Sequence, residues 1–540
     1  MSKVYDYIVI GSGFGGSVSA MRLAEKGYDV LVIEKGKEID VKNFPKTNWD
    51  FKRFYWAPLF KWFGILKLTL FKDVFVISGV GVGGGSLGYA NTHMYPSDLF
   101  FENPIWANQV PGKFNGKGWK EVLEPFYQKA RFMLGSVKNK IFNRDDEILK
   151  EVAKDMGMEA SFGGVNVGVY FGDQEKEVDP YFKGLGPLRK GCTECAGCMI
   201  GCRENAKNTL DKNYLFFAKK FGALIKAECQ VDKIEYTEKI YNLKTRSSTS
   251  WFNKNVQTFK SKNLVVSGGV LGTMDLLLKQ KHDHKTLNRL SDCLGENLRT
   301  NSESLCGVTS GGEKLNHGIA ITSVFNPDEH THIEAAKYPN GSNSMKFFAT
   351  LATGPGPAPV RAIKLIFNIL TSPFKFVKLM INRKWAENSV ILVVMQSLDN
   401  SMKMVYRSFP FKGMSIKNQK DNKVPAYIEV GQNVMHRYAK KVNGTPQNAL
   451  TEVLFNMSST AHILGGCPMG KTLETGVINN KFEVHGYPGM YILDGSIMPC
   501  NLGVNPSLTI TALSEYAMSW IPEKPENKNV SLDEQLKALA

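Results

Sequence analysis

The chain has 540 residues, 43% of them hydrophobic, so it is long enough for two domains with large buried cores. No apolar run reaches the roughly 18 residues that a transmembrane helix needs. The net charge of +16 would suit a nucleic-acid binder, but the basic residues are spread out and no nucleic-acid-binding motif accompanies them, so we expect no nucleic-acid partner. Because the first predicted strand begins near residue 5, we expect no signal peptide and a cytoplasmic protein.

The N-terminal segment carries a dinucleotide-binding pattern. Residues 5–10 form an apolar run typical of a buried parallel strand, and a helix is predicted from Ser17. Between them lie four glycines: Gly11, Gly13, Gly15 and Gly16. Their missing Cβ atoms allow a tight turn and close approach of a pyrophosphate. A strand over 29–33 then ends at Glu34, where a carboxylate can bind ribose hydroxyls. The pattern does not distinguish FAD from NAD.

A second glycine-rich loop follows at residues 79–91, with valines interleaved. Backbone can approach a flat ligand closely only where Cβ atoms are missing, so we expect this loop to lie against the cofactor. The alternative is a flexible linker. The candidate cofactor-binding residues of the loop are Gly83, Gly84, Gly85, Ser86 and Asn91.

Two segments combine basic residues with aromatic and aliphatic ones, at 54–72 and 360–385. This alternation is typical of helices that lie on an anionic membrane surface. It is equally compatible with amphipathic helices that cover the protein's own core. We expect possible peripheral membrane contact, from the second segment more than from the first.

Four of the nine cysteines form a C-x2-C-x2-C-x3-C run: Cys192, Cys195, Cys198 and Cys202. The same spacing holds iron–sulfur clusters in bacterial ferredoxins, although Arg203 stands where those runs have proline. An iron–sulfur cluster, a zinc site and a packed loop of reduced thiols all remain open. The other five cysteines are scattered, which does not indicate a disulfide framework.

Motifs of the nucleotide-binding fold recur along the chain, so we predict two interleaved domains. A strand is expected within 223–236, and 263–279 repeats the order strand, glycine turn, helix. The FAD-binding domain would take residues 1–100, 186–310 (with the cysteine loop) and 451–525. A substrate or cap domain would take 101–185 and 311–450, and 526–540 would be a C-terminal tail.

The segment 461–511 carries the candidate chemistry. His462 precedes a glycine-rich turn, and Asn505 lies in an Asn-Pro pair just before an apolar helix. Two neutral polar groups in one apolar pocket suit alcohol oxidation, because one can take the hydroxyl proton while the other holds the oxygen.

These motifs, in this order, resemble those of the GMC (glucose–methanol–choline) oxidoreductases, and the final set resembles the cholesterol oxidase-like subgroup. The resemblance implies an α/β fold: a Rossmann-like FAD-binding domain interleaved with an α+β substrate domain built on an antiparallel sheet. It implies that His462 accepts or shares the hydroxyl proton and that Asn505 contacts the flavin and positions the substrate. It also implies that Asp494 and Gly495 bind the FAD chain, that the Val231 backbone contacts adenine, and that His93 lies where some relatives attach FAD covalently.

The resemblance implies oxidation of the CH–OH group of a sterol or other bulky apolar alcohol by hydride transfer to flavin, with oxygen as acceptor. Alternatives are a dehydrogenase passing electrons through an iron–sulfur cluster to a protein or quinone acceptor, and a non-catalytic flavin-bearing lipid-binding protein. One departure concerns a glutamate base of cholesterol oxidases. By spacing its position falls near Asn343, and the nearest carboxylate is Glu334, which leaves an isomerase step in doubt.

Overall fold

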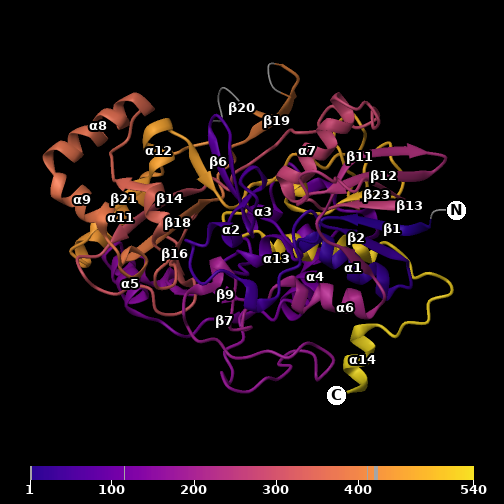
Figure 1. The fold of residues 1–540 in the computed structure, drawn as a ribbon, viewed down its shortest axis with the longest axis horizontal. Helices are drawn as coiled ribbons and strands as arrows, with labels where there is room; N and C mark the ends of the chain where they lie inside the picture. The colour runs from indigo at the N-terminus through magenta and orange to yellow at the C-terminus, as the bar shows by residue number, and fades with distance from the viewer. Residues whose placement is uncertain (1–2, 115, 410–411, 419–423, 540) are drawn as a thin grey trace.

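The glycine fingerprint lies in a mostly parallel sheet of seven strands, on the right of Figure 1. Its order is β10-β2-β1-β13-β12-β11, and β23 pairs with β13. β1 runs parallel to β2 and β13, whereas β11 and β12 form an antiparallel extension. The strands are β1 Val4–Ile10, β2 Val30–Ile33, β10 Leu224–Lys226, β11 Cys229–Thr237, β12 Ile240–Ser247, β13 Gln257–Val266 and β23 Met490–Ile492.

A second seven-stranded sheet lies beside it, on the left of Figure 1, in the order β17-β21-β14-β18-β16-β15-β8. All of its neighbouring strands pair antiparallel. Its strands are β8 Gly163–Gly164, β14 Ser304–Thr309, β15 Ile321–Phe325, β16 Thr331–Ala336, β17 Ala349–Leu351, β18 Ser389–Gln396 and β21 Thr445–Ala449. The structure is a computed structural model that describes residues 3–114, 116–409, 412–418 and 424–539.

A three-stranded sheet of β5 Leu66–Leu70, β6 Val74–Gly79 and β22 Ser458–Thr460 brings the second glycine loop beside the segment of His462. Short pairs complete the strands: β3 Trp56–Ala57 with β4 Trp62–Phe63, β7 Val137–Lys138 with β9 Asn166–Val167, and β19 Met402–Arg407 with β20 Gly413–Asn418.

The α-helices are α1 Phe14–Glu25, α2 Phe51–Phe54, α3 Asp98–Phe101, α4 Trp119–Met133, α5 Arg144–Asp155, α6 Tyr214–Lys220, α7 Gly269–His282, α8 Ala358–Thr371, α9 Pro373–Ile381, α10 Trp385–Asn388, α11 Glu429–Lys441, α12 Leu450–Phe455, α13 Ser507–Ser519 and α14 Leu532–Ala538.

The two faces of the antiparallel sheet have different neighbours. On one face, alternate residues of β14, β16 and β18 pack with α5 and α11 in a hydrophobic core. On the other face, Glu334 pairs with Val393, and Val393 pairs with Leu305. Because residues directly opposite one another point to the same face of a sheet, these three side chains form one row. Glu334 is therefore a single carboxylate in an otherwise apolar row.

The expected mixture of a Rossmann-like sheet with an antiparallel sheet is confirmed, but two local predictions are wrong. The first helix begins at Phe14, not at Ser17, because Gly13 already acts as its N-cap. The segment 54–72 contains β3, β4 and β5 in place of a helix, since Pro58 and Gly64 interrupt it. The segment 360–385 is helical, as α8 and α9. Among the described residues, none of the helices has the length and apolarity to cross a bilayer.

Candidate active site

The two glycine-rich loops meet at the carboxyl end of β1. A Cβ on Gly84 would lie 2.6 Å from the Cα of Gly13, so only glycines allow the contact. Ser12 joins the loops: its hydroxyl oxygen lies 3.2 Å from the Gly81 carbonyl oxygen and accepts a hydrogen bond from the Gly83 amide (3.1 Å). Gly83 and Gly84 both have positive φ (106° and 54°), which other residues rarely adopt.

Glu34, at the end of β2, reaches this junction. Its carboxylate accepts hydrogen bonds from the Ser12 amide (3.1 Å), the Ser12 hydroxyl (2.8 Å) and the Gly36 amide (2.8 Å). The side chain is buried at the start of α1, whose N-terminal amides favour an anion. The structure thus brings the carboxylate predicted to bind ribose to the loop predicted to bind pyrophosphate.

The residues around the junction fit a bound dinucleotide. A Cβ on Gly13 would meet no atom within 4 Å, whereas one on Gly15 would lie 1.7 Å from the Leu493 carbonyl oxygen. Gly13 therefore faces open space where the pyrophosphate is expected, and Gly15 and Gly16 serve close packing. The buried Asn91 amide has no hydrogen-bond partner on either polar atom, as expected of a group whose partner is a ligand.

Asp494 follows β23 directly and lies buried beside α7. It accepts hydrogen bonds from the Ser496 amide (2.8 Å) and hydroxyl (2.6 Å) and from the Thr273 hydroxyl (2.5 Å). Burial raises the pKa of its carboxyl group. Gly495 starts a 3-10 turn behind it, and Val231 lies buried in β11, two strands from β13.

His462 lies against a buried carboxylate that the sequence did not single out. Its Nδ1 is 3.1 Å from Oε2 of Glu303. The same oxygen accepts hydrogen bonds from the Thr460 hydroxyl (2.7 Å) and the Ala461 amide (2.9 Å). Burial lowers the pKa of His462, but Glu303, aided by Glu334, outweighs burial and raises that pKa above its ordinary value. Glu303 and Glu334 thus make this imidazole a stronger base than a free imidazole.

Asn505 and Glu334 form the other half of the cluster. The Asn505 Nδ2 donates to Oε2 of Glu334 at 3.1 Å, and the Asn505 Oδ1 has no partner. Nε2 of His332 lies 3.1 Å from the other Glu334 oxygen. Glu334 is fully buried, and its charge acts on His462. All three sequence candidates, His462, Asn505 and Glu334, thus belong to one cluster.

A strained turn holds both halves of this cluster. Asn301 and Ser302 have positive φ (58° and 45°) immediately before Glu303. The Asn301 side chain donates to the Val504 carbonyl (3.0 Å) and accepts from the Gly503 amide (2.9 Å), just before Asn505. Two consecutive non-glycine residues in the left-handed region are costly, which is typical of a functional site.

Asn343, near which spacing put the glutamate position of cholesterol oxidases, lies outside the cluster. Its side-chain amide donates to the Arg383 carbonyl (2.7 Å), and its oxygen accepts from the Ala386 amide (2.8 Å). Asn343 fastens the segment before α10 and contacts no residue of the cluster in these bonds. The carboxylate that faces Asn505 is Glu334, nine residues earlier.

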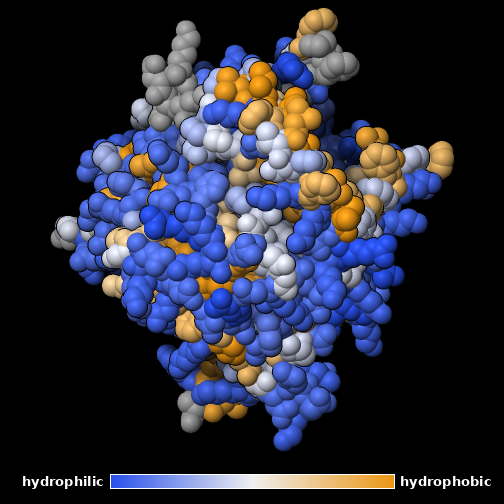
Figure 2. Space-filling view, turned by 90° about the vertical axis from the view of Figure 1, so that its left-hand side faces the viewer, coloured by the Kyte–Doolittle hydropathy of each residue, from blue (hydrophilic) through white to orange (hydrophobic). Residues whose placement is uncertain are grey.

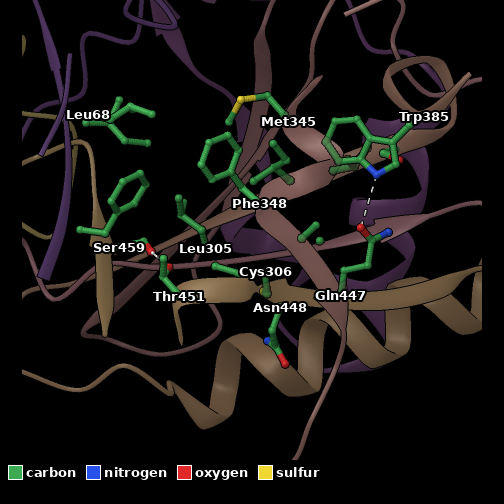
Figure 3. Close-up of a pocket in the computed structure, with 18 of the residues that line it drawn as sticks. Leu68, Leu305, Cys306, Met345, Phe348, Trp385, Gln447, Asn448, Thr451 and Ser459 are labelled. Carbon is green, nitrogen blue, oxygen red and sulfur yellow. Dashed lines mark hydrogen bonds between the residues drawn. The ribbon is translucent and has the colours of Figure 1, made fainter. Parts of the chain in front are cut away.

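An apolar cavity opens on the sheet face that carries Glu334 (Figure 3). Its empty space is about 710 Å³, including its opening to solvent. Leu305 and Ser459 line it: Leu305 shares the row of Glu334, and Ser459 lies three residues before His462. Its few polar contacts include the Trp385 indole, which donates to Gln447 (3.4 Å, dashed in Figure 3).

The four cysteines of the C-x2-C-x2-C-x3-C run line one smaller cavity. Nevertheless, in the part of the chain that the structure describes, no three His, Cys, Asp or Glu side chains are placed to share a metal ion. The structure therefore gives the iron–sulfur prediction no support. The buried Lys207 amine instead ties the loop together by donating to the carbonyls of Leu87 (3.0 Å), Tyr89 (2.9 Å) and Cys198 (2.7 Å).

His93 is fully buried behind the second glycine loop. Its Nε2 lies 3.2 Å from the Tyr89 hydroxyl, its Nδ1 has no hydrogen-bond partner, and burial lowers its pKa to about 3. The imidazole is thus neutral at physiological pH. Covalent attachment of a flavin here stays a prediction.

Comparison with known proteins agrees with this geometry. Residues 188–302 and 395–514 match two family models described as GMC oxidoreductase, and 9–48 match a NAD(P)-binding Rossmann-like domain. A cholesterol oxidase of Acinetobacter baumannii is 39% identical over 96% of this chain and 95% of its own length. One of Mycobacterium tuberculosis is 40% identical over 97% and 92%. A long-chain-alcohol oxidase of Arabidopsis thaliana is 22% identical over 97% and 68%.

Solved structures share the fold at low sequence identity. Pyridoxine 4-oxidase from Mesorbium loti has a TM-score of 0.61 at 13% identity, over 96% of this chain and 99% of its own. An FAD-dependent oxidoreductase from Chaetomium thermophilum has a TM-score of 0.60 at 15% identity, over 99% and 100%. Near-full-length identity of about 40% to the two cholesterol oxidases, with both family models, shows that the chain belongs to the GMC oxidoreductases.

Proposed function

We propose that this protein uses FAD to oxidise the hydroxyl group of a sterol, or of another bulky apolar alcohol, to a carbonyl group. The observation that carries the proposal is the cluster of His462, Asn505 and Glu334, whose Glu334 shares a sheet face with an apolar cavity. The cavity suits a bulky apolar body, and the cluster suits a single polar group. The names of the two cholesterol oxidases favour a sterol over a linear alcohol.

In this proposal His462 accepts the hydroxyl proton on its Nε2. Glu303, beside Nδ1, then stabilises the imidazolium that forms, as a carboxylate does for the histidine of a catalytic triad. The amide of Asn505 orients the alcohol oxygen from the other side. FAD, when bound, would supply the acceptor for the hydride of the carbinol carbon, with oxygen as the final acceptor of the two electrons.

Glu334 suits a separate role in this proposal, the movement of a carbon-bound proton after oxidation. It is a fully buried carboxylate joined to Asn505, so it faces the same substrate end as His462. With Glu334→Gln we expect a Δ5-sterol to be oxidised to its 3-keto steroid without isomerisation to the conjugated Δ4 product. The ultraviolet absorbance of the conjugated ketone measures the isomerisation. If that variant forms the conjugated product at the wild-type rate, Glu334 does not move the carbon-bound proton.

The test of the main proposal is anaerobic reduction of the bound flavin by a 3-hydroxysteroid, with a long-chain alcohol beside it. Bleaching of the flavin absorbance by the steroid, with recovery in air, is the expected result. Bleaching by the long-chain alcohol alone would move the substrate class to linear alcohols. A flavin that neither alcohol reduces would favour the third hypothesis, a lipid-binding flavoprotein without turnover.

The dehydrogenase alternative is not favoured, because the cysteine loop offers no group of ligands placed to share a metal ion within the described ranges. Recovery of the flavin in air tests it directly. A reduced flavin that persists under oxygen, but is reoxidised by a quinone or an artificial electron acceptor, would support a dehydrogenase over an oxidase.

A further inference from the structure

Helix α8 carries a row of apolar side chains that face solvent. Ile363, Ile366, Phe367 and Leu370 are all exposed, Leu370 to 73%. They recur at the spacing of one helical face, and the opposite face is anchored by the buried Leu365. Apolar side chains singly exposed are ordinary, but four on one helix form a patch that calls for a partner.

Helix α9 continues this patch. Phe374, Val377 and Ile381 are exposed, Phe374 to 87%, while Leu379 is buried against the protein. Figure 2 looks onto the side of the molecule where α8 and α9 lie, and hydrophobic side chains gather in the upper half of that view, with hydrophilic ones around them.

A chain of aromatic contacts extends the patch to the other basic and apolar segment. Phe347 meets Trp49 at 5.9 Å between ring centroids, Trp49 meets Phe51 at 5.9 Å, Phe51 meets Trp62 at 5.5 Å, and Trp62 meets Phe60 at 5.2 Å. Phe347, Trp49 and Phe60 are exposed. This run of rings joins the segment 54–72 to Phe347, and the neighbouring Lys346 amine donates to the Asn382 carbonyl (3.2 Å), within the segment 360–385. We call α8, α9 and this run the docking face.

The charge around the docking face has one sign. Residues 335–386 contain eight basic side chains and no aspartate or glutamate. Lys364, Lys375, Lys378, Arg383 and Lys384 are exposed among the apolar side chains. Basic residues flanking an apolar helical face, with aromatic rings at its edge, are typical of helices that lie in the interface of an anionic membrane.

The inner side of the docking face packs against residues of the cavity wall. Leu365 and Leu379 share a hydrophobic cluster with Leu68, Met345 and Trp385, which line the cavity. The docking face and the cavity are thus joined through one hydrophobic cluster.

A buried ion pair fixes α8 in this position. The Arg361 guanidinium donates to Oε1 of Glu452 at 2.7 Å and to the Thr353 hydroxyl at 3.2 Å. Both charges of the pair are buried, and Glu452 belongs to α12. The exposed apolar row therefore sits on an anchored helix and does not depend on a fraying one.

We propose that the docking face binds an anionic phospholipid bilayer and lies in its interfacial layer. A second copy of the chain would place the same basic rim against itself, and a chain of net charge +16 opposes that contact. A bilayer with acidic headgroups can pair with the lysines and bury the apolar row at the same time. Uptake of a membrane-dissolved alcohol into the cavity would follow, and that part alone rests on the proposed function.

The test is co-sedimentation of the full-length holoenzyme with phosphatidylcholine vesicles, with and without phosphatidylserine. We expect binding that requires phosphatidylserine and weakens with salt, because screening removes the attraction of the lysines. The double variant F367E/F374E should bind at least about tenfold more weakly, since two aromatic side chains leave the lipid. K375Q/K378Q should lose about fivefold per lysine removed.

The matched control is V530E/L539E, which makes the same change at two exposed apolar positions near α14, on the opposite side of Figure 1 from α8. It should bind vesicles as the wild type does. Equal loss in this control, or no vesicle binding by the wild type, overturns the proposal. So does a dimer that F367E/F374E converts to monomer while vesicle binding stays. Flavin reduction by a cyclodextrin-carried steroid should be unchanged in F367E/F374E, and its failure in the wild type would count against the proposed function alone.

Discussion

The two seven-stranded sheets contribute to the site in opposite ways. The mostly parallel sheet offers backbone: Gly13, Gly83 and Gly84 meet at its carboxyl edge, and only their lack of side chains lets the loops touch. The antiparallel sheet offers side chains: Glu334 projects from β16 into an apolar row, and the cavity opens on that face.

This difference explains why the contacts between the glycine loops can be predicted from the sequence, whereas the contacts within the side-chain cluster cannot. A backbone cradle requires glycines at fixed spacing within one short segment, which is a local constraint. A side-chain cluster requires only that its members end up close together. Glu303, Glu334, His462 and Asn505 come from four separate segments, and the fold alone brings them together.

The largest effect on the reaction rate is expected from substitution of His462, in the side-chain cluster. His462→Ala should lower the rate of alcohol oxidation by about 10²–10⁴-fold, the usual contribution of a general base, while FAD stays bound. Steady-state oxidation of a 3-hydroxysteroid and the flavin absorbance of the same sample measure both quantities. His317→Ala, at an exposed histidine, is the control and should leave the rate unchanged. A fully active H462A enzyme would end the role proposed for this imidazole.

Substitutions of the loop glycines should distinguish residues needed for cofactor binding from residues needed for folding. Gly13→Val places its side chain in open space within the cradle, so we expect loss of FAD with little change in the melting temperature of the apoprotein. Gly15→Ala would clash with the Leu493 carbonyl and should destabilise the fold by about 1–3 kcal/mol or more. FAD content and thermal unfolding measure the two effects. Gly112→Val, which also faces open space away from the loops, should change neither.

A smaller effect is expected from substitution of Glu303, which acts on the reaction through His462. Glu303 holds the pKa of His462 above its ordinary value, so kcat/KM should rise with pH as the imidazolium loses its proton through that raised pKa. Glu303→Gln removes the charge, so the rising limb should move to lower pH. The plateau rate should fall by roughly tenfold, because the imidazolium formed in the reaction loses its partner.

The pH profiles of E303Q and of Glu296→Gln, an exposed glutamate paired with Lys403, provide the comparison. Glu296→Gln should reproduce the wild-type profile. An unshifted limb in E303Q, or activity that falls with rising pH over the same range, would mean that His462 does not act as the base.

The same contrast between local and distant constraints governed the fold. The segments 54–72 and 360–385 have similar composition, yet the first forms short strands and the second forms α8 and α9. Pro58 and Gly64 interrupt the first segment, whereas Pro357 and Pro373 stand at helix starts in the second, where proline is tolerated. Their shared aromatic surface could not be inferred, because it depends on contacts such as Phe347 with Trp49.

Spacing along the chain left open whether Glu334 takes part in the site, because the position expected for the relatives' glutamate fell near Asn343, beyond the end of β16. Strand register places Glu334 opposite Val393, so its side chain faces the cavity side of the sheet. The metal content of the cysteine run stays a prediction: its four cysteines line one small cavity, but among the described residues no three ligand side chains are placed to share a metal ion.

By itself the sequence determined the parallel nucleotide sheet, its glycine loops, Glu34 and the positions of His462 and Asn505, because each depends on residues close together in the chain. Only the tertiary structure decided that Glu303 would lie beside His462, that Glu334 would bond Asn505, and that an apolar cavity would open between the antiparallel sheet and strands β5, β6 and β22. The physical reason is that these contacts join segments up to 171 residues apart, and no local preference encodes such a pairing.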